Sequence, residues 1–162
     1  MAEEKKITKL LAGFLALCIL ASGALAFAYK IDRESARPIN LEDVIEVTDD
    51  SQYFYGLDPV EISDDGMLHI SGWVVNREKD LTYIDRKVVL ADDAGNACAL
   101  KTIAGERGLT WFFDTGYNYD DGGLVSQGLL KTIPVDKDYH ILFLVTEDGK
   151  RYLFDLNTVV SL

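Results

Sequence analysis

Ring-bearing and hydrogen-bonding side chains gather in the segment from residue 111 to residue 121. The candidate ligand-binding residues in it are Trp111, Tyr117, Asn118, Tyr119, Asp120 and Asp121. Flat aromatic faces beside amide and carboxylate acceptors are the groups that carbohydrate sites need. The segment also lacks clear periodicity, which is frequent in functional loops. We therefore expect a ligand to bind here, with a glycan as the candidate. For Trp111 and the two phenylalanines after it, however, the favoured interpretation is that they plug one end of the fold.

Two neighbouring carboxylates in this segment could serve calcium. Asp120 and Asp121 precede Gly122 and Gly123, and calcium prefers hard oxygen ligands. The spacing does not match the alternating acidic loop that binds calcium in EF-hands, so we interpret the run as an acidic turn. The sequence predicts no cofactor and no metal site.

The residue types used in catalysis do not form a recognisable constellation. His69 and His140 each lie inside an expected strand, without a partner cysteine or a second histidine nearby, so we expect structural roles for both. Ser71, Ser126 and Ser161 lack the strand–turn–helix setting of an activated serine. Carboxylate pairs suited to glycoside hydrolysis occur by chance in any acidic β protein. We predict that the chain is not an enzyme, and we assign no catalytic residue.

The charge of the chain restricts its partners. The formal net charge is −11. Beyond Arg37, ten Lys and Arg stand against 23 Asp and Glu, a net charge of −13. Such a surface repels nucleic acid and anionic lipid, so a nucleic-acid partner is excluded. The simplest interpretation is an acidic surface that is solvated and has no binding role. The alternative is that it binds cations or a basic partner.

The elements that must hold these residues are β-strands. Short runs rich in β-branched and aromatic residues alternate with turn signals such as Asp64-Asp65-Gly66. No helix-period segment of useful length occurs after residue 29. The pattern predicts an all-β domain over residues 52–162, an antiparallel β-sandwich of jelly-roll or Greek-key type. The expected strands are Met67–Asn76, Lys87–Ala91, Ala97–Ile103, Leu129–Val135, Tyr139–Thr146 and Arg151–Leu156.

For several positions in this pattern the sequence predicts a specific place in the fold. Gly72 lies inside a strand and indicates a bulge or a close backbone approach. Trp73 follows it among apolar neighbours, so we expect it in the core rather than as a sugar platform. Residues 139–146 have the strongest strand pattern and should be central in a sheet, paired with residues 151–156. Residues 104–128 should be the least regular part of the domain.

A set of short motifs resembles a known kind of module. The strand Ile70-Ser71-Gly72-Trp73-Val74-Val75 is followed by a D-x-x-G turn, by Arg107 and by a hairpin ending in Gly149-Lys150-Arg151-Tyr152. These features resemble small β-sandwich modules of bacterial cell-surface and cell-envelope glycan proteins, which share an I-x-G-W strand and a G-x-x-Y hairpin. The resemblance covers roughly Met67 to Leu156 and implies a β-sandwich in the cell envelope. There the arginine commonly precedes an Asp-Val-like pair, whereas Arg107 precedes Gly108-Leu109-Thr110.

The N-terminal run from Leu10 to Tyr29 contains no charge. About 20 apolar residues are enough for a helix to cross a bilayer. Lys5, Lys6 and Lys9 precede the run, as the positive-inside rule expects of a cytoplasmic flank. We predict a cytoplasmic tail over residues 1–9, a transmembrane signal anchor over 10–29, a linker and lead-in over 30–51, and an extracytoplasmic domain over 52–162.

Cleavage of this run is the alternative to a retained anchor. Ala24, Ala26 and Ala28 offer A-x-A-like sites, and cleavage there would release a secreted domain. The run is longer than the roughly 7–15 residues of a usual signal core, which favours the retained anchor. Cys18 lies inside the run and Cys98 is the only other cysteine, so we expect no intrachain disulfide.

Three functions fit these observations. The favoured one is a non-enzymatic, single-pass, membrane-tethered binding or scaffolding module outside the cytoplasm, whose partner is a glycan or a protein of the bacterial cell envelope. The alternative is an accessory structural subunit of a membrane protein complex, in which small anchor residues such as Gly13 and Gly23 allow close helix approach. A glycan hydrolase is the least supported, since no catalytic constellation occurs.

Overall fold

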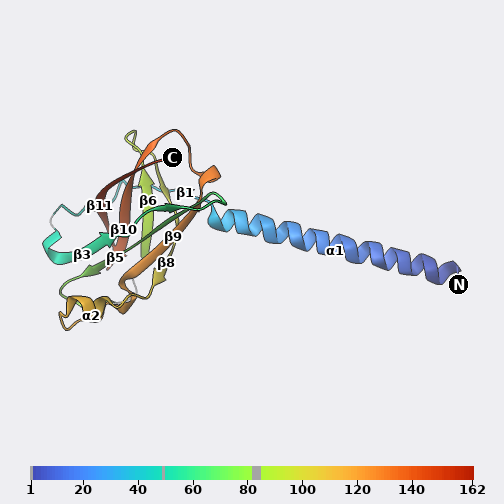
Figure 1. The fold of residues 1–162 in the computed structure, drawn as a ribbon, viewed down its shortest axis with the longest axis horizontal. Coiled ribbons are helices and arrows are strands. Elements are labelled where there is room, and N and C mark those ends of the chain that lie inside the picture. Colours follow the sequence, from blue (N-terminus) through green and yellow to red (C-terminus); the bar gives the residue numbers. More distant parts are fainter. Residues whose placement is uncertain (1, 49, 82–84) are drawn as a thin grey trace. The chain divides into compact units, whose positions relative to one another are not determined.

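The computed structural model of the protein describes residues 2–48, 50–81 and 85–162. Met1 of the expected cytoplasmic tail and Asp49 of the expected lead-in lie outside the described residues. The chain divides into two compact units, Met1–Arg33 and Glu34–Leu162. The first unit is helical and the second consists mainly of strands (Figure 1).

Helix α1 (Ala2–Glu34) makes up the first unit. It contains no proline, and its apolar side chains, such as Phe14 and Leu20, are exposed. The stretch Lys9–Glu34 has 26 residues and a mean hydropathy of 2.4, so it is long and apolar enough to cross a membrane. The helix continues past Tyr29, where the sequence predicted the end of the span, because no proline or glycine stops it before Glu34.

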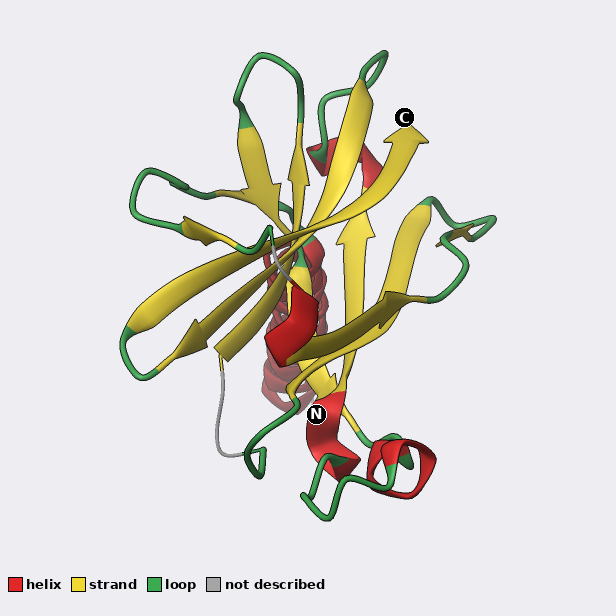
Figure 2. Cartoon of the chain, turned by 90° about the vertical axis from the view of Figure 1, so that its left-hand side faces the viewer, coloured by secondary structure: helices red, strands yellow, loops and turns green. Residues whose placement is uncertain are grey.

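The second unit contains two sheets, and its helical segments are single short turns (Figure 2). The strands are β1 (Arg37–Pro38), β2 (Ile45–Glu46), β3 (Tyr53–Leu57), β4 (Glu61–Ile62), β5 (Met67–Asn76), β6 (Asp85–Ala91), β7 (Ala97–Ala99), β8 (Lys101–Gly105), β9 (Gly123–Leu129), β10 (Asp138–Glu147) and β11 (Lys150–Ser161). The helical turns are η1 (Asp50–Gln52), α2 (Leu109–Phe113), η2 (Asp120–Gly122) and η3 (Leu130–Thr132).

Antiparallel pairing dominates both sheets. The first sheet has the order β1-β7-β6-β10-β11-β2, and its β11–β2 pair is parallel. The second sheet has the order β3-β5-β9-β8, with β4 also paired to β5. The expected central position of β10 and its hairpin with β11 are confirmed. The all-β prediction is therefore confirmed at the level of two mainly antiparallel sheets.

One hydrophobic cluster contains side chains from both sheets. In β5 the alternate residues Leu68, Ile70 and Val74 enter this cluster, as strand geometry requires of one face. The chain changes sheets between β7 and β8 at Leu100, whose side chain is buried in the same cluster. The other buried members are Tyr53, Val88, Leu90, Leu124, Ile133, Tyr139, Ile141, Phe143, Val145 and Phe154.

Two smaller clusters cover the outer faces of the sheets. Ile39, Leu41 and Val44 of the lead-in pack with Val89 and Leu142 on the first sheet. The expected linker is therefore ordered against the domain from β1 onward, since these apolar side chains gain burial there. On the second sheet, a cluster around Val75, Leu109 and Tyr119 is formed by the segment that carries α2.

The expected strand Leu129–Val135 is wrong. The chain instead forms β9 over Gly123–Leu129 and then the turn η3. The Thr132 hydroxyl donates a hydrogen bond to the Leu129 carbonyl oxygen at 2.7 Å and so closes this turn. Consequently β9 lies inside the region that was expected to be irregular.

Gly72 is confirmed as a site of close backbone approach. A Cβ atom at residue 72 would overlap the Gly56 carbonyl oxygen and the Phe143 ring. The expectation that Trp73 lies in the core is confirmed only in part: strand alternation turns its side chain to the outer face with His69 and Ser71, where it packs against the smaller cluster around Val75 and not in the cluster shared by the two sheets. The Trp73 ring is partly buried there by the segment that carries α2.

Candidate functional site

The short helix α2 presents two aromatic side chains to solvent. Trp111 is 86% exposed and Phe112 is 68% exposed, although both are large apolar residues. Tyr117, four residues after the helix, is also exposed. We call Trp111, Phe112 and Tyr117 the aromatic tip. Of the residues expected to bind a ligand, Trp111 and Tyr117 are thus positioned to do so, and Phe112 is an exposed ring that the sequence analysis did not select.

Tyr119 is not part of the exposed tip, and the expectation that it is exposed is wrong. Its side chain has no exposed surface. Its hydroxyl donates to the Arg77 carbonyl oxygen at 2.8 Å and accepts from the Thr115 hydroxyl at 3.0 Å. Its backbone N–H donates to the Thr110 hydroxyl at 2.6 Å. Tyr119 therefore fixes the loop to the sheet rather than offering a ring to a ligand.

The tip stands on an ordered aromatic base. Phe113 stacks on Phe54 with ring centroids 3.9 Å apart and an interplanar angle of 7°. The Arg77 guanidinium lies 4.1 Å from the centroid of the same Phe54 ring. Phe113 also meets Phe112 edge to face, with centroids 5.0 Å apart. The base restricts the motion of α2, so the exposed rings are held in place by packing beneath them.

Asn118, one of the polar residues of the predicted site, forms its hydrogen bonds within the loop and to Asp80. The Asn118 side-chain oxygen accepts from the Thr110 hydroxyl at 3.4 Å and from the Asp120 N–H at 3.1 Å. The Asn118 N–H donates to Asp80 at 2.7 Å. The side chains of Asp120 and Asp121 are exposed. Among the described residues, no group of three or more His, Cys, Asp and Glu side chains is arranged to hold a metal ion.

A second constellation lies on the outer face of the second sheet. Strand register places Gly56, Trp73, Gly123 and Gly105 side by side across β3, β5, β9 and β8. A Cβ at Gly56 would overlap the Trp73 indole, and one at Gly123 would lie 3.1 Å from Cγ of Arg107. The glycines of this row therefore leave room for the Trp73 ring and for the Arg107 stem that lies over the sheet.

Arg107 is held by several contacts at once. Its Nη2 pairs with Oδ2 of Asp58 at 2.5 Å, and its guanidinium lies 4.9 Å from the Trp73 ring centroid. The Ser71 hydroxyl donates to the same Asp58 oxygen at 2.6 Å. Partial burial acts to raise the pKa of the Asp58 carboxyl, but the hydrogen bonds from Arg107 and Ser71 outweigh it, and the pKa lies below its usual value. The carboxylate is therefore ionised at neutral pH.

A small hollow adjoins this ion pair. It has a volume of about 170 Å³ and is lined by Asp58, Pro59, Glu61, His69, Ser71 and Val125, among others. His69 lies 3.5 Å from the Ser63 hydroxyl. That hydroxyl donates to Asp65 at 2.5 Å and lies 3.1 Å from the Met67 carbonyl oxygen, so the pair with His69 lacks the short, directed bond of a serine activated by histidine.

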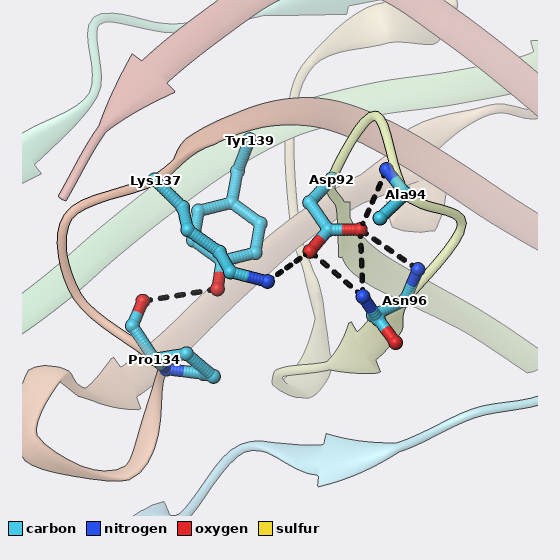
Figure 3. A network of polar contacts seen from close by, with 6 residues as sticks. All are labelled: Asp92, Ala94, Asn96, Pro134, Lys137 and Tyr139. Atoms are coloured by element: carbon cyan, nitrogen blue, oxygen red, sulfur yellow. Dashed lines mark hydrogen bonds and ion pairs between the residues drawn. The ribbon is translucent and has the colours of Figure 1, made fainter.

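A third polar network joins the β6–β7 turn to the start of β10 (Figure 3). Asp92 accepts hydrogen bonds from Asn96, from the Ala94 N–H and from the Lys137 ammonium. The Lys137 ammonium and the Asn96 amide hold the pKa of the Asp92 carboxyl well below its usual range. Among the residues that the structure describes, all hydrogen bonds accepted by this carboxylate come from the turn or from Lys137, so we assign the network to structure.

The Asp58–Arg107 pair was not predicted from the sequence, because the two residues are 49 positions apart. The available signals were the glycines in otherwise apolar strands and the single arginine that the resemblance pointed to. The chain matches no known protein family, no curated protein and no solved structure.

Proposed function

We propose that the chain is a non-enzymatic, membrane-tethered scaffolding module of the bacterial cell envelope. In this proposal α1 is retained as a single-pass anchor, with the lysine-bearing end in the cytoplasm. The second unit is an antiparallel β-sandwich outside the cytoplasm, and it binds a partner protein through Trp111 and Phe112. The hydropathy and length of α1 support the anchor.

The exposure of Trp111 and Phe112 carries the proposal. Two adjacent large apolar side chains in water reduce solubility, and contiguous exposed apolar surface is characteristic of interaction sites. Tryptophan is also enriched among the residues that dominate binding energy at protein interfaces. Because Phe113 and Tyr119 fix the helix from below, little conformational freedom is lost when a partner binds.

The charges around the tip indicate the chemistry of the partner. Asp80, Asp114, Asp120 and Asp121 lie in or directly beside the loop that carries the tip, and their side chains are exposed. The chain beyond Arg37 has ten Lys and Arg against 23 Asp and Glu. A complementary partner has an apolar pocket for the rings and a rim of lysine or arginine around it.

A glycan fits the tip less well than a protein does. Tyr119 is buried, so one of the three rings expected to stack on sugars is absent from the surface. The Asn118 side-chain oxygen is already engaged by Thr110 and Asp120. The tip thus offers hydrophobic surface with acidic surroundings, which suits a basic protein surface better than a neutral sugar.

The alternative is an accessory subunit that assembles through α1. Gly13 and Gly23 support it, because residues without a side chain allow the backbone of a second helix to approach closely. The two functions differ in which part of the chain contacts the partner.

Photo-crosslinking in cells that make the protein separates these functions. A benzophenone amino acid replaces Phe112 in one variant and Leu20 of α1 in another. The proposal predicts a crosslinked protein at residue 112 that disappears when Trp111→Ala is added. A stoichiometric crosslink at residue 20 with none at residue 112 would support the accessory subunit and contradict the tip.

A further inference from the structure

We propose that the uncovered part of the second sheet's outer face binds a neutral, hydroxyl-rich ligand, a glycan, between the Asp58–Arg107 pair and His69. This site is separate from the aromatic tip and does not depend on the proposed partner protein. It uses the outward side chains of β4, β5, β8 and β9.

The strand register arranges these side chains in two rows. Ser71, Val125 and Ile103 form the row next to Asp58, across β5, β9 and β8. Glu61, His69, Gln127 and Lys101 form the next row, across β4, β5, β9 and β8. Polar groups therefore flank the exposed apolar side chains Val125 and Ile103 on both sides. A sugar ring needs the same combination, with an apolar surface for its C–H face and polar groups for its hydroxyls.

The glycine row beside this surface is costly for a sheet. Glycine in a strand interior weakens the strand, and here three glycines share one register row with Trp73. They leave room for Trp73 and for the stem of Arg107. In addition, the Trp73 indole N–H is buried without a hydrogen-bond partner among the described residues. Conformational and hydrogen-bonding costs concentrated in one row suggest that the placement of Arg107 serves a function.

The hydrogen-bonding groups of the site include both donors and acceptors. Arg107 and Gln127 supply donors, and Glu61 supplies an acceptor. Both side-chain bonds to Asp58 end on Oδ2, so its Oδ1 accepts no hydrogen bond from the described residues. A hydroxyl group donates and accepts, so neighbouring hydroxyls of a sugar can satisfy an Asp–Arg pair together.

The charges nearest the hollow disfavour the competing ligand classes, while Lys101 lies at the β8 end of the second row. An anion bound to Arg107 would meet the carboxylates of Asp58 and Glu61. A cation bound to Asp58 would meet Arg107, which already neutralises that carboxylate. A neutral ligand with many hydroxyls is the class that uses the donors and acceptors without this repulsion.

The size of the hollow limits what it encloses. Its volume of about 170 Å³ is below the roughly 300–1,000 Å³ of pockets that surround a drug-sized ligand. We therefore infer that one sugar ring enters the hollow beside Ser71 and His69. The rest of an oligosaccharide would lie on the open surface formed by Val125 and Ile103.

Binding of neutral oligosaccharides to the full-length protein in lipid nanodiscs tests this site. The probes are hexasaccharides of β-1,3-glucose, β-1,4-glucose, α-1,4-glucose and β-1,4-N-acetylglucosamine, measured calorimetrically up to about 10 mM, a range that covers millimolar affinities. We expect at least one probe to bind. Asp58→Asn and Arg107→Lys should each weaken it roughly tenfold or more, because the first removes the charge of an acceptor and the second replaces the planar guanidinium by an ammonium that cannot reproduce its fork of donors. Asp43→Asn, an exposed change on the lead-in, is the matched control and should leave the affinity unchanged.

A surface variant guards against loss of folding. Gln127→Ala alters a partly exposed side chain of the same row and should weaken binding without lowering the melting temperature. Trp111→Ala should leave glycan binding intact, which separates this site from the tip. The proposal is overturned if no probe binds, if a sulfated oligosaccharide binds better than every neutral one, or if Trp111→Ala abolishes binding while Gln127→Ala does not.

Discussion

The hydroxyl of Tyr119 donates a hydrogen bond of 2.8 Å to the carbonyl oxygen of Arg77, a residue 42 positions earlier in the chain. Arg77 directly follows β5 and packs its guanidinium on Phe54. This one bond therefore connects the loop after α2 to the end of the longest strand of the second sheet. It explains how an irregular segment can hold exposed rings in a fixed position.

Truncation of Tyr119 should destabilise the domain. Removal of a fully buried aromatic side chain leaves a cavity, so Tyr119→Ala should lower the free energy of unfolding by about 3–5 kcal/mol. Tyr119→Phe keeps the ring and should cost only about 1 kcal/mol, since it removes the hydroxyl bonds. Urea unfolding of the full-length protein measures both. The exposed Tyr117→Ala is the control, and an effect of Tyr119→Ala as small as that of Tyr117→Ala would contradict the burial of Tyr119.

A methyl group at residue 56 should displace the Trp73 indole. The Cβ of Gly56→Ala would overlap that ring, so we expect a loss of about 1–3 kcal/mol in the free energy of unfolding and a changed tryptophan emission spectrum. Gly108→Ala is the matched control, because a Cβ there meets nothing within 4 Å and the φ of Gly108 is −67°. Equal stability of the two variants would show that the indole does not occupy this space.

The Asp92–Lys137 pair should make stability depend on pH. Lys137 and Asn96 lower the pKa of the Asp92 carboxyl below its usual 3.8, so the stabilisation is present above that pH and is lost as the pH falls through the folded-state pKa. The hydrogen bond to Asp92 raises the pKa of Lys137 above 10.5, so its contribution is present below that pH and is lost as the pH rises through the folded-state value.

Urea unfolding between about pH 2 and pH 6 measures the acid side of this dependence. Asp92→Asn should flatten the rise of stability with pH, because an amide cannot be protonated in this range. Asp43→Asn, at an exposed position of the lead-in, should keep the slope of the unchanged protein. If stability depends on pH as steeply in Asp92→Asn as in the unchanged protein, Asp92 does not cause this dependence.

Strong alternation made most of the strands predictable. In β5, β6, β10 and β11 apolar residues occupy the face that enters the shared cluster, and glycines at positive φ mark the turn before β5, at Gly66, and the turn between β10 and β11, at Gly149. β9 was missed because Gly123 and Gly128 dilute its apolar pattern, while its neighbours in space supply the packing. The local sequence pattern therefore predicted the strands in which apolar and polar residues alternate. It failed for β9, whose strand conformation depends on contacts with residues distant in sequence.

The candidate site was only partly predictable. The favoured interpretation that Trp111 and the two phenylalanines plug one end of the fold is wrong for Trp111 and Phe112, which are exposed, and only Phe113 packs on the sheet. Tyr117 is exposed, as expected in a segment without periodicity. The same reasoning failed for Tyr119, whose burial depends on Arg77 and on the cluster around Val75, both far away in sequence. The sequence did not predict which face of β5 Trp73 occupies, because apolar residues lie on both sides of it and the parity of the strand was ambiguous.

The predicted topology can be tested by labelling with an impermeant thiol reagent. Ser161 is exposed at the end of β11, so Ser161→Cys should react in intact cells that lack an outer membrane. Background from Cys98 should be low, since burial and the Asp92 charge raise the pKa of that thiol and reduce its thiolate fraction. The unchanged protein is the control. Labelling of Ser161→Cys only after lysis would reverse the proposed orientation.

The scaffolding function is tested most directly by one dissociation constant. It is measured between the full-length protein in nanodiscs and the partner protein that crosslinks at residue 112. Trp111→Ala should raise this constant by roughly 10- to 100-fold, as expected for an aromatic anchor residue, without a change in melting temperature, because the side chain is 86% exposed. The complex should also weaken as salt concentration increases, since the surroundings of the tip are acidic. An unchanged dissociation constant in Trp111→Ala would contradict the central claim that the aromatic tip binds the partner.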